Sequence, residues 1–153
     1  MCEEKTAEPS TAQAGKNSLS AAFVFPQPTG KYAVGTNLFY WTDLTRKDPE
    51  TNKPRELVVQ VWYPAEGKMG SLTAPYTYEG LADFKKDEAD ATKEKIDLIR
   101  THAISDALPV SEKGTLYPLI VFGHGYGMSR GQYSFFCEEI ASHGYIVAMV
   151  MHL

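Results

Sequence analysis

The alternation of apolar and polar residues divides the N-terminal half of the chain into short segments. Residues 38–41 form a compact apolar run, and residues 55–63 alternate between the two faces of an extended strand. Residues 48–54, between them, are rich in Asp, Pro, Asn and Lys, which is typical of a turn. The pattern therefore predicts an antiparallel hairpin built from residues 38–41 and 55–63.

A helical period replaces this alternation in the middle of the chain. Residues 65–80 are rich in Gly, Thr and Tyr and indicate a loop. Across residues 81–104 apolar side chains recur every three or four positions among charges of both signs, as in a helix with one solvated face. We therefore expect a helix over residues 81–104, followed by a second loop rich in Pro and Gly.

The C-terminal part of the chain predicts a strand–turn–helix–strand unit. Residues 119–122 form a short buried strand, and they lead directly into the glycine-rich residues 123–127. Residues 133–141 carry apolar side chains at helical spacing, Gly144 is a suitable C-cap, and residues 145–153 are a β-branched apolar run. Two strands joined through a helix imply a parallel sheet with helices on its faces.

Composition and charge restrict the classes of protein to which the chain can belong. It has 153 residues, of which 43% are hydrophobic and 22% charged, and a formal charge of −4. These values fit a globular domain, and the acidic balance argues against a surface for nucleic acid. No apolar run approaches the roughly 18 residues of a membrane span. Two cysteines, Cys2 and Cys137, cannot build a disulfide framework.

The N-terminal residues 1–24 contain little that could be buried. We therefore expect a disordered leader or linker there and a folded domain over residues 25–153. The pattern of a signal peptide, a charged stretch followed by an apolar one, is not expected from residues 1–24. Cys2 followed by acidic residues would suit the mature end of a lipid-anchored bacterial protein, although we favour an incidental cysteine after the start Met. The compartment stays open: secreted or lipid-anchored if Cys2 carries a lipid, and cytoplasmic otherwise.

The glycine-rich sequence Gly123-His-Gly-Tyr-Gly127 is the main candidate for chemistry. It lies between a predicted strand and a predicted helix, and open parallel sheets bind ligands at the carboxyl ends of their strands. Backbone N–H groups in such a turn could stabilise the oxyanion of an ester's transition state, each contributing about 3–4 kcal/mol. A phosphate cradle and a purely structural turn are the alternatives. A nucleotide loop fits poorly, because neither Lys-Ser/Thr nor G-x-G-x-x-G is present.

The overlapping sequence Gly127-Met-Ser-Arg-Gly131 formally matches the G-x-S-x-G nucleophile elbow. An elbow follows its strand directly, whereas the preceding glycine-rich turn separates Ser129 from the strand. No Asp follows Ser129, and Glu138 and Glu139 lie roughly 14–15 Å further along the same predicted helix, at about 1.5 Å per residue. Because triad side chains must be within hydrogen-bond reach, we expect Ser129 to be a solvated or N-capping hydroxyl rather than the nucleophile.

The remaining candidates point to structural roles. The histidines share no metal-ligand spacing and Cys137 lies on an apolar helix face, so no metal is expected. His124 would shape the turn, and His143 suits the negative end of a helix dipole. Six aromatic residues could line a ligand pocket, although aromatic packing is the commoner explanation. These six residues are Tyr32, Trp41, Trp62, Tyr63, Tyr76 and Tyr78.

Four segments of the chain carry a resemblance to a known family. They are Pro28-Thr-Gly-Lys-Tyr-Ala-Val-Gly-Thr36, Arg55-Glu-Leu-Val-Val-Gln-Val-Trp-Tyr-Pro-Ala65, Tyr117-Pro-Leu-Ile-Val-Phe-Gly-His-Gly-Tyr-Gly127 and residues 140–148. In this order they resemble the N-terminal half of the platelet-activating factor acetylhydrolases of the plasma and intracellular type II kind, and of their bacterial α/β-hydrolase relatives. The resemblance runs from about Phe25 to the last residue.

The resemblance implies a partial α/β-hydrolase fold: the N-terminal hairpin strands and one βαβ unit of the parallel sheet, truncated after the fourth strand. It also implies a carboxylic ester hydrolase with a Ser-Asp-His mechanism and no cofactor. The substrate would be platelet-activating factor, a 1-alkyl-2-acetylglycerophosphocholine, or a related short-chain acyl ester. Tyr126 would supply one oxyanion-hole N–H, and the triad would lie beyond Leu153. The other residues of this oxyanion loop would be Gly123, His124, Gly125 and Gly127.

Without the triad, the chain alone is expected to lack esterase activity. An open apolar edge at residues 119–122 would also make it marginally stable or prone to aggregation. The expected partner is a small lipid or acyl ester, with a peripheral membrane contact and no nucleic acid, and the oligomeric state stays open. The alternative is a non-catalytic or degenerate hydrolase module that holds an acyl or anionic ligand without cleaving it.

Overall fold

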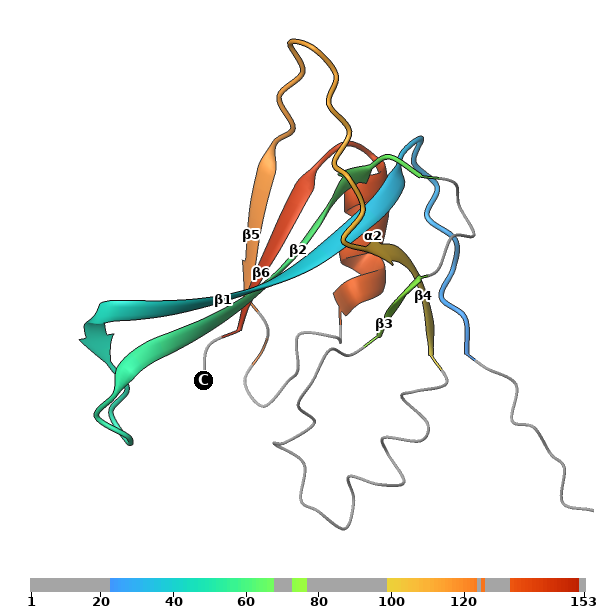
Figure 1. Ribbon diagram of the computed structural model, residues 1–153. Helices are drawn as coiled ribbons and strands as arrows, with labels where there is room; N and C mark the ends of the chain where they lie inside the picture. The colour runs from blue at the N-terminus through green and yellow to red at the C-terminus, as the bar shows by residue number, and fades with distance from the viewer. Residues whose placement is uncertain (1–22, 68–72, 77–98, 124, 126–132, 152–153) are drawn as a thin grey trace, which may run out of the picture.

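The computed structural model describes residues 23–67, 73–76, 99–123, 125 and 133–151, which form a sheet with a helix, α2, packed against one of its faces (Figure 1). The bounds of these elements are β1 Ala33–Lys47, β2 Pro54–Ala65, β3 Thr73–Pro75, β4 Arg100–Ser105, β5 Leu119–Gly123, α2 Ser134–Ser142 and β6 Ile146–Met151.

The six strands form one mixed, curled sheet in the order β3-β4-β1-β2-β6-β5. β1 and β2 are antiparallel neighbours, and β5 and β6 are parallel neighbours joined through α2. These pairings confirm the predicted hairpin and the predicted strand–turn–helix–strand unit. β2 pairs with β6 in antiparallel orientation and so connects the two units into one sheet.

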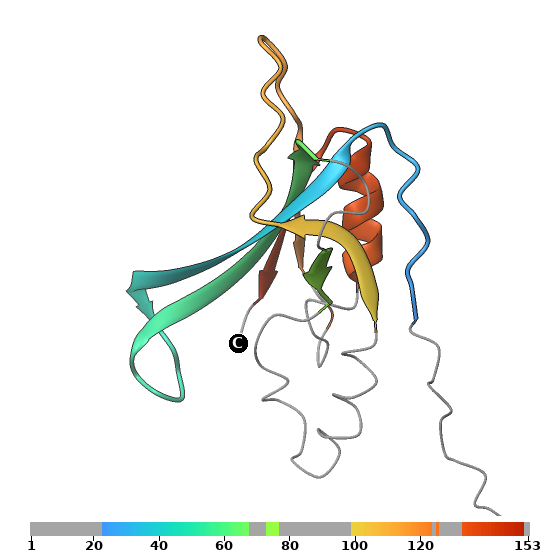
Figure 2. The same ribbon diagram turned by 45° about the vertical axis from the view of Figure 1, so that its right-hand side comes forward.

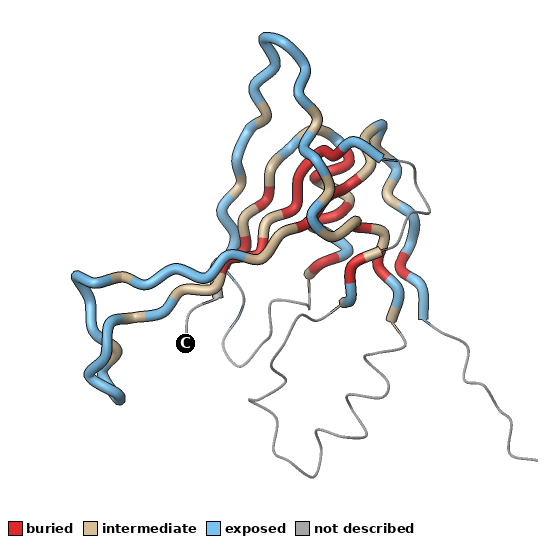
Figure 3. Tube along the Cα trace, viewed as in Figure 1, coloured by how far each residue is buried: buried red, intermediate tan, exposed pale blue. Residues whose placement is uncertain are grey.

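The hairpin is longer than its apolar core predicted, because the ladder between β1 and β2 runs from Ala33 opposite Ala65 to Asp43 opposite Arg55. The turn between the strands is where composition placed it. The Asp48 carboxylate accepts the backbone N–H of Thr51 at 2.7 Å, which fixes this turn. The distal half of the hairpin extends beyond the rest of the sheet and is largely exposed (Figure 3).

Two predictions in the middle of the chain are wrong. Residues 100–105, placed in a helix by the sequence pattern, form β4, and β3 lies within the predicted loop over residues 65–80. β4 pairs with β3 on one side and with β1 on the other. Tertiary strand pairing therefore overrides the local three-to-four spacing. The rest of the predicted helix, residues 81–98, lies outside the described residues.

The core lies between α2 and one face of the sheet (Figure 2). Cys137 and Ala141 on α2 pack against Trp62 of β2 and against Val147 and Met149 of β6. The core cluster comprises Val34, Trp62, Ala103, Cys137, Ala141, Val147 and Met149.

The core ends where α2 ends, and it does not extend to the sheet face opposite α2, on which side chains of β5 are exposed. The C-cap is His143, and Gly144, which the sequence offered as the C-cap, is the next residue; it has φ of 96° and donates its N–H to the Ala141 carbonyl. On the face away from α2, Leu119 and Val121 of β5 are exposed at 61% and 67%.

The described part of the chain contains no helix with the length and apolar character needed to cross a membrane.

Candidate functional site

The glycine-rich turn that the sequence singled out lies between β5 and α2. Gly123 is the last residue of β5, Gly125 is exposed, and α2 begins at Ser134. The position of the turn is therefore defined by the end of β5 and the start of α2. The remaining predicted site residues, His124, Tyr126, Gly127 and Ser129, lie outside the described residues.

Contacts on both sides fix the ends of this turn. The rings of Phe122, at the end of β5, and Tyr133, just before α2, meet edge to face at a centroid separation of 5.3 Å. Gly123 is the register partner of Val150 in the parallel pair of β5 and β6. The described ends of the turn thus lie at the carboxyl edge of this pair, where the sequence placed them.

The helix after the turn begins within one residue of where the apolar spacing placed it, since α2 is Ser134–Ser142. Its N-cap is Tyr133, which makes no side-chain capping hydrogen bond, and the capping role expected of Ser129 falls outside the described residues. Glu138 and Glu139, the carboxylates that follow Ser129, do lie on this helix as expected.

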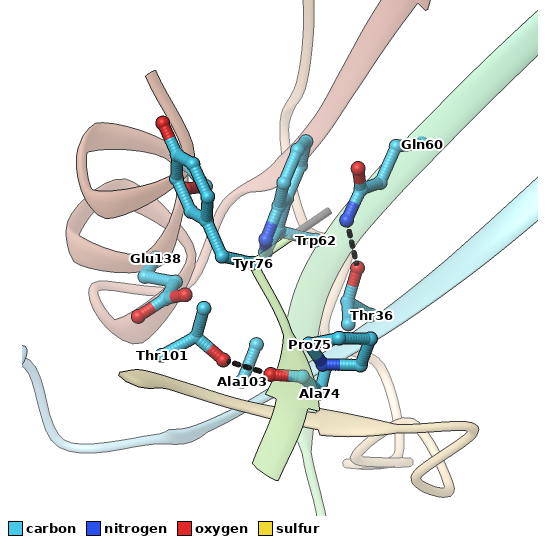
Figure 4. Close-up of a pocket in the computed structure, with 10 residues that line it drawn as sticks. Thr36, Gln60, Trp62, Ala74, Pro75, Tyr76, Thr101, Ala103 and Glu138 are labelled. Carbon is cyan, nitrogen blue, oxygen red and sulfur yellow. Dashed lines mark hydrogen bonds between the residues drawn. The ribbon is translucent and has the colours of Figure 1, made fainter. Parts of the chain in front are cut away.

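A small pocket, lined by both polar and apolar side chains, lies between α2 and strands of the sheet (Figure 4). Its lining brings together Trp62 and Tyr76, two of the aromatic residues predicted either to line a pocket or to pack in the core. Trp62 does both, since it lines the pocket and is almost fully buried. Hydrogen bonds from Gln60 to Thr36, at 3.2 Å, and from Thr101 to the Ala74 carbonyl, at 2.5 Å, hold the walls of the pocket.

Glu138 is the polar residue of this pocket that sequence reasoning missed. Its side chain is only 1% exposed, and its Oε2 accepts the backbone N–H of His102 at 3.0 Å. Burial raises the pKa of the Glu138 carboxyl to about 7, and the His102 N–H opposes that rise. The helical spacing held a signal for this burial, because Glu138 is next to Cys137 and three positions before Ala141, both of which face the core.

A second cluster brings a hydroxyl, an imidazole and a carboxylate together on the surface. His143 Nε2 lies 3.0 Å from Glu139 Oε1 and 3.1 Å from the Thr29 hydroxyl. The Thr29 hydroxyl and its backbone N–H both donate to the Glu139 carboxylate, and these bonds lower the pKa of Glu139. The side chains are those of a hydrolytic triad, so their geometry decides what they do.

That geometry is structural rather than catalytic. In a working triad the imidazole uses one nitrogen for the carboxylate and the other for the hydroxyl. Here a single nitrogen, Nε2 of His143, faces both partners, so there is no path for a proton between them. The cluster also lies at the C-terminal end of α2, away from the turn that precedes the helix. Its effect is to attach the segment before β1 to α2.

Within the described residues no group of three or more His, Cys, Asp or Glu side chains could hold a metal ion. Cys137 lies on the apolar helix face predicted for it, and its thiol is buried in the core. Burial raises the pKa of this thiol to about 12, which makes it an inert core side chain rather than a nucleophile.

Comparison with known proteins adds an independent observation. The family model described as platelet-activating factor acetylhydrolase, isoform II, matches residues 17–153. Platelet-activating factor acetylhydrolase from Gallus gallus is 29% identical over 148 residues, which is 90% of this chain and 32% of that protein. The enzyme of the same name from Cavia porcellus is 56% identical over 39 residues, 26% of this chain and 9% of that protein.

A solved structure shares the fold as well as sequence. A ferulic acid esterase from Streptomyces cinnamoneus superposes with a TM-score of 0.70 at 32% identity, covering 86% of this chain and 37% of that one. The chain thus spans about a third of the length of the chicken acetylhydrolase and of this esterase. Since the family model matches residues 17–153, nearly the whole chain, the chain belongs to the family of platelet-activating factor acetylhydrolases of the isoform II type.

Proposed function

We propose that the chain is the N-terminal part of a carboxylic ester hydrolase that uses a Ser-Asp-His triad. Its substrates would be small lipid or acyl esters, with platelet-activating factor and related short-chain esters as the leading class. The observation that carries this proposal is the glycine-rich turn between β5 and α2, at the carboxyl edge of a parallel strand pair, in a chain of this family.

The role proposed for the turn is to hold the negative charge that develops on the ester carbonyl oxygen. Tyr126 would donate its backbone N–H to that oxygen, within the loop that runs from Gly123 to Gly127. The fixed ends of the turn support this role, because a donor must be held in place before the reaction. The Phe122–Tyr133 ring contact and the β5–β6 ladder hold the two described ends of the turn.

We further propose that residues 25–153 belong to a larger hydrolase domain that supplies the triad. The open apolar edge and face of β5 support this proposal, since Leu119 and Val121 would be covered by further strands and helices. The chemistry of the described residues is consistent with it: Glu139 and His143 are engaged with Thr29, and Glu138 is bonded to β4. Ser129 would then be a residue of the oxyanion loop, and the nucleophile would lie further along the chain.

A fluorophosphonate probe, which labels activated serines, tests the assignment of the nucleophile. We expect no labelling of the 153-residue chain and no hydrolysis of p-nitrophenyl acetate by it. The protein translated through any in-frame sequence after Leu153 should be labelled, and Ser129→Ala should leave that labelling unchanged. Labelling of the 153-residue chain that disappears with Ser129→Ala would overturn the proposed role of Ser129. A stop codon directly after Leu153 would favour a non-catalytic module.

The same longer protein tests the oxyanion donor. Tyr126→Pro removes the backbone N–H, whereas Tyr126→Ala keeps it and removes only the side chain. Removing one oxyanion donor should lower kcat by about 10²–10³-fold. We therefore expect a loss of that size for Tyr126→Pro and a much smaller one for Tyr126→Ala. Equal losses in the two variants would show that the side chain, rather than the N–H, carries the effect.

A further inference from the structure

Glu138 is a fully buried carboxyl group that the proposed hydrolysis does not use. Its side chain points from α2 into the pocket of Figure 4, where one oxygen, Oε2, accepts the His102 N–H. The other oxygen, Oε1, is buried and has no hydrogen-bond partner among the described residues. An unsatisfied buried oxygen is costly, and the cost is larger when the group carries a charge.

The Glu138 carboxyl group accepts a backbone N–H of β4 at His102, a position that the described pairing of β4 with β1 does not include. β4 pairs with β1 only at its C-terminal end, where Ile104 and Ser105 lie opposite Gly35 and Thr36. The preceding residues of β4 run past α2, so the ladder to β1 does not reach His102. The Glu138 carboxyl accepts this N–H and thereby connects α2 to β4.

β4 in turn holds two other segments, and together they form what we call the β3–β4 layer: residues 23–25, β3 and β4. Phe25 donates its N–H to the Arg100 carbonyl at 3.2 Å, and the Arg100 N–H donates to the Phe23 carbonyl at 2.8 Å. His102 Nε2 lies 2.8 Å from the Phe25 carbonyl oxygen. Among the described contacts, the Glu138 bond is thus a polar link between α2 and this whole layer.

The charge state of Glu138 is set by its surroundings. The titratable groups that face it from the described elements are the His102 imidazole on β4, the Tyr76 phenol after β3 and the Cys137 thiol on its own helix. The groups from β1 and β2, namely Thr36, Gln60 and Trp62, are neutral. No described cation forms an ion pair with the carboxylate, and burial raises the pKa of Glu138 to about 7.

We propose that Glu138 is a proton-dependent contact between α2 and the β3–β4 layer: the neutral carboxyl group keeps the layer packed on the helix, and loss of its proton loosens it. A neutral group still accepts the His102 N–H through its carbonyl oxygen. An ionised group leaves a buried negative charge with one unsatisfied oxygen. The device does not depend on the proposed esterase activity and can be measured on this chain.

The raised pKa of Glu138 determines how the stability of the fold changes with pH. The pKa of Glu138 is raised in the folded chain above the 4.5 of an ordinary glutamate, so the folded state binds the proton more tightly than the unfolded state. The stabilisation by Glu138 is therefore fully present below pH 4.5 and is lost as the pH rises through about 7. Loosening of the β3–β4 layer should follow the same range.

Trp62 provides a direct optical probe, because it lines the same pocket as Glu138. The chain has two tryptophans, so Trp41→Phe leaves Trp62 as the sole reporter. In this variant, acrylamide quenching of Trp62 should be weak at pH 5.5 and increase severalfold by pH 8.5, with a midpoint near pH 7. Adding Glu138→Gln, which resembles the protonated carboxyl group, should keep the quenching weak at both pH values.

Glu139→Gln is the matched control, since it neutralises the adjacent but exposed carboxylate and should leave the midpoint unchanged. Quenching that does not change with pH in Trp41→Phe would overturn the proposal. So would a transition that persists in Trp41→Phe/Glu138→Gln, which would assign it to His102 or another group. If Glu138→Gln fails to fold, the infrared band of a buried protonated carboxyl group in the wild-type chain gives the same answer: it must disappear with a midpoint near pH 7.

Discussion

At the scale of single residues, Gly30 shows how closely the segment before β1 approaches α2. Its N–H donates to the Ser142 hydroxyl at 3.0 Å, and Tyr32 donates to the Ser142 carbonyl at 3.1 Å. A Cβ atom at position 30 would lie only 2.1 Å from the Ser142 carbonyl oxygen. Because that oxygen belongs to the backbone of a packed helix, the neighbour cannot rotate away. The position therefore requires glycine for space.

We expect Gly30→Ala to lower the free energy of unfolding by about 1–3 kcal/mol, the usual cost of an overpacked site. Gly123→Ala is the matched control, because a Cβ there would meet nothing within 4 Å and should leave stability nearly unchanged. Urea unfolding followed by circular dichroism measures both variants. Equal free energies of unfolding for Gly30→Ala and Gly123→Ala would show that, in solution, the segment before β1 does not lie as close to Ser142 as the structure places it.

At the scale of elements, the packing of α2 on the sheet depends on which face of each strand is covered. Trp62 of β2 faces α2 and is 1% exposed, whereas Trp41 of β1 lies in the distal half of the hairpin and is 54% exposed. Trp41 stacks on Phe39 at a centroid separation of 5.9 Å and otherwise faces solvent. One tryptophan is thus a core residue and the other is a surface residue, depending on whether another layer covers its strand face.

Trp62→Ala should destabilise the chain by about 3–5 kcal/mol, because it removes a large core side chain and leaves a cavity. Trp41→Ala removes an equal volume from the surface and should cost at most about 1 kcal/mol. Both values can be read from the midpoints of urea unfolding with the slope held constant. A similar loss of unfolding free energy in the two variants would mean that Trp41, like Trp62, is packed against other side chains in solution.

Local sequence was enough to predict some of these elements and not others. The hairpin was predictable because alternation and a polar turn are local signals, and Asp48 builds that turn from its own neighbours. β4 was not, because residues 100–105 become a strand only through pairing with β1 and β3, which are distant in sequence. The carboxyl of Glu138 completes that strand's hydrogen bonding from a helix more than thirty positions away.

At the scale of the whole molecule, α2 covers one face of the sheet and leaves part of the other face bare. β5 is the last strand at one edge, and the exposed side chains of Leu119 and Val121 lie on the face away from α2. An apolar edge strand of this kind pairs readily with other chains. The chain by itself should therefore self-associate as its concentration rises.

Val121→Lys should reduce this association, because a charge on an exposed edge strand opposes pairing with another chain. Leu116→Lys is the control: Leu116 is 94% exposed in the loop before β5, outside the sheet, and its replacement should change association little. Static light scattering over a concentration series measures the effect. If Val121→Lys associated as strongly as the unchanged chain, the edge at β5 would not be the surface responsible.

By itself the sequence determined the family, the hairpin, the unit of β5, α2 and β6, and the place of the glycine-rich turn. All of these rest on signals within a few consecutive residues: period, turn composition and motif order. Only the tertiary structure decided that residues 100–105 are a strand, that the Glu138 carboxyl accepts the His102 N–H, and that Thr29, Glu139 and His143 attach the segment before β1 to α2. Those outcomes depend on which distant segments meet, and hydrogen-bond partners far apart in the chain leave no local pattern.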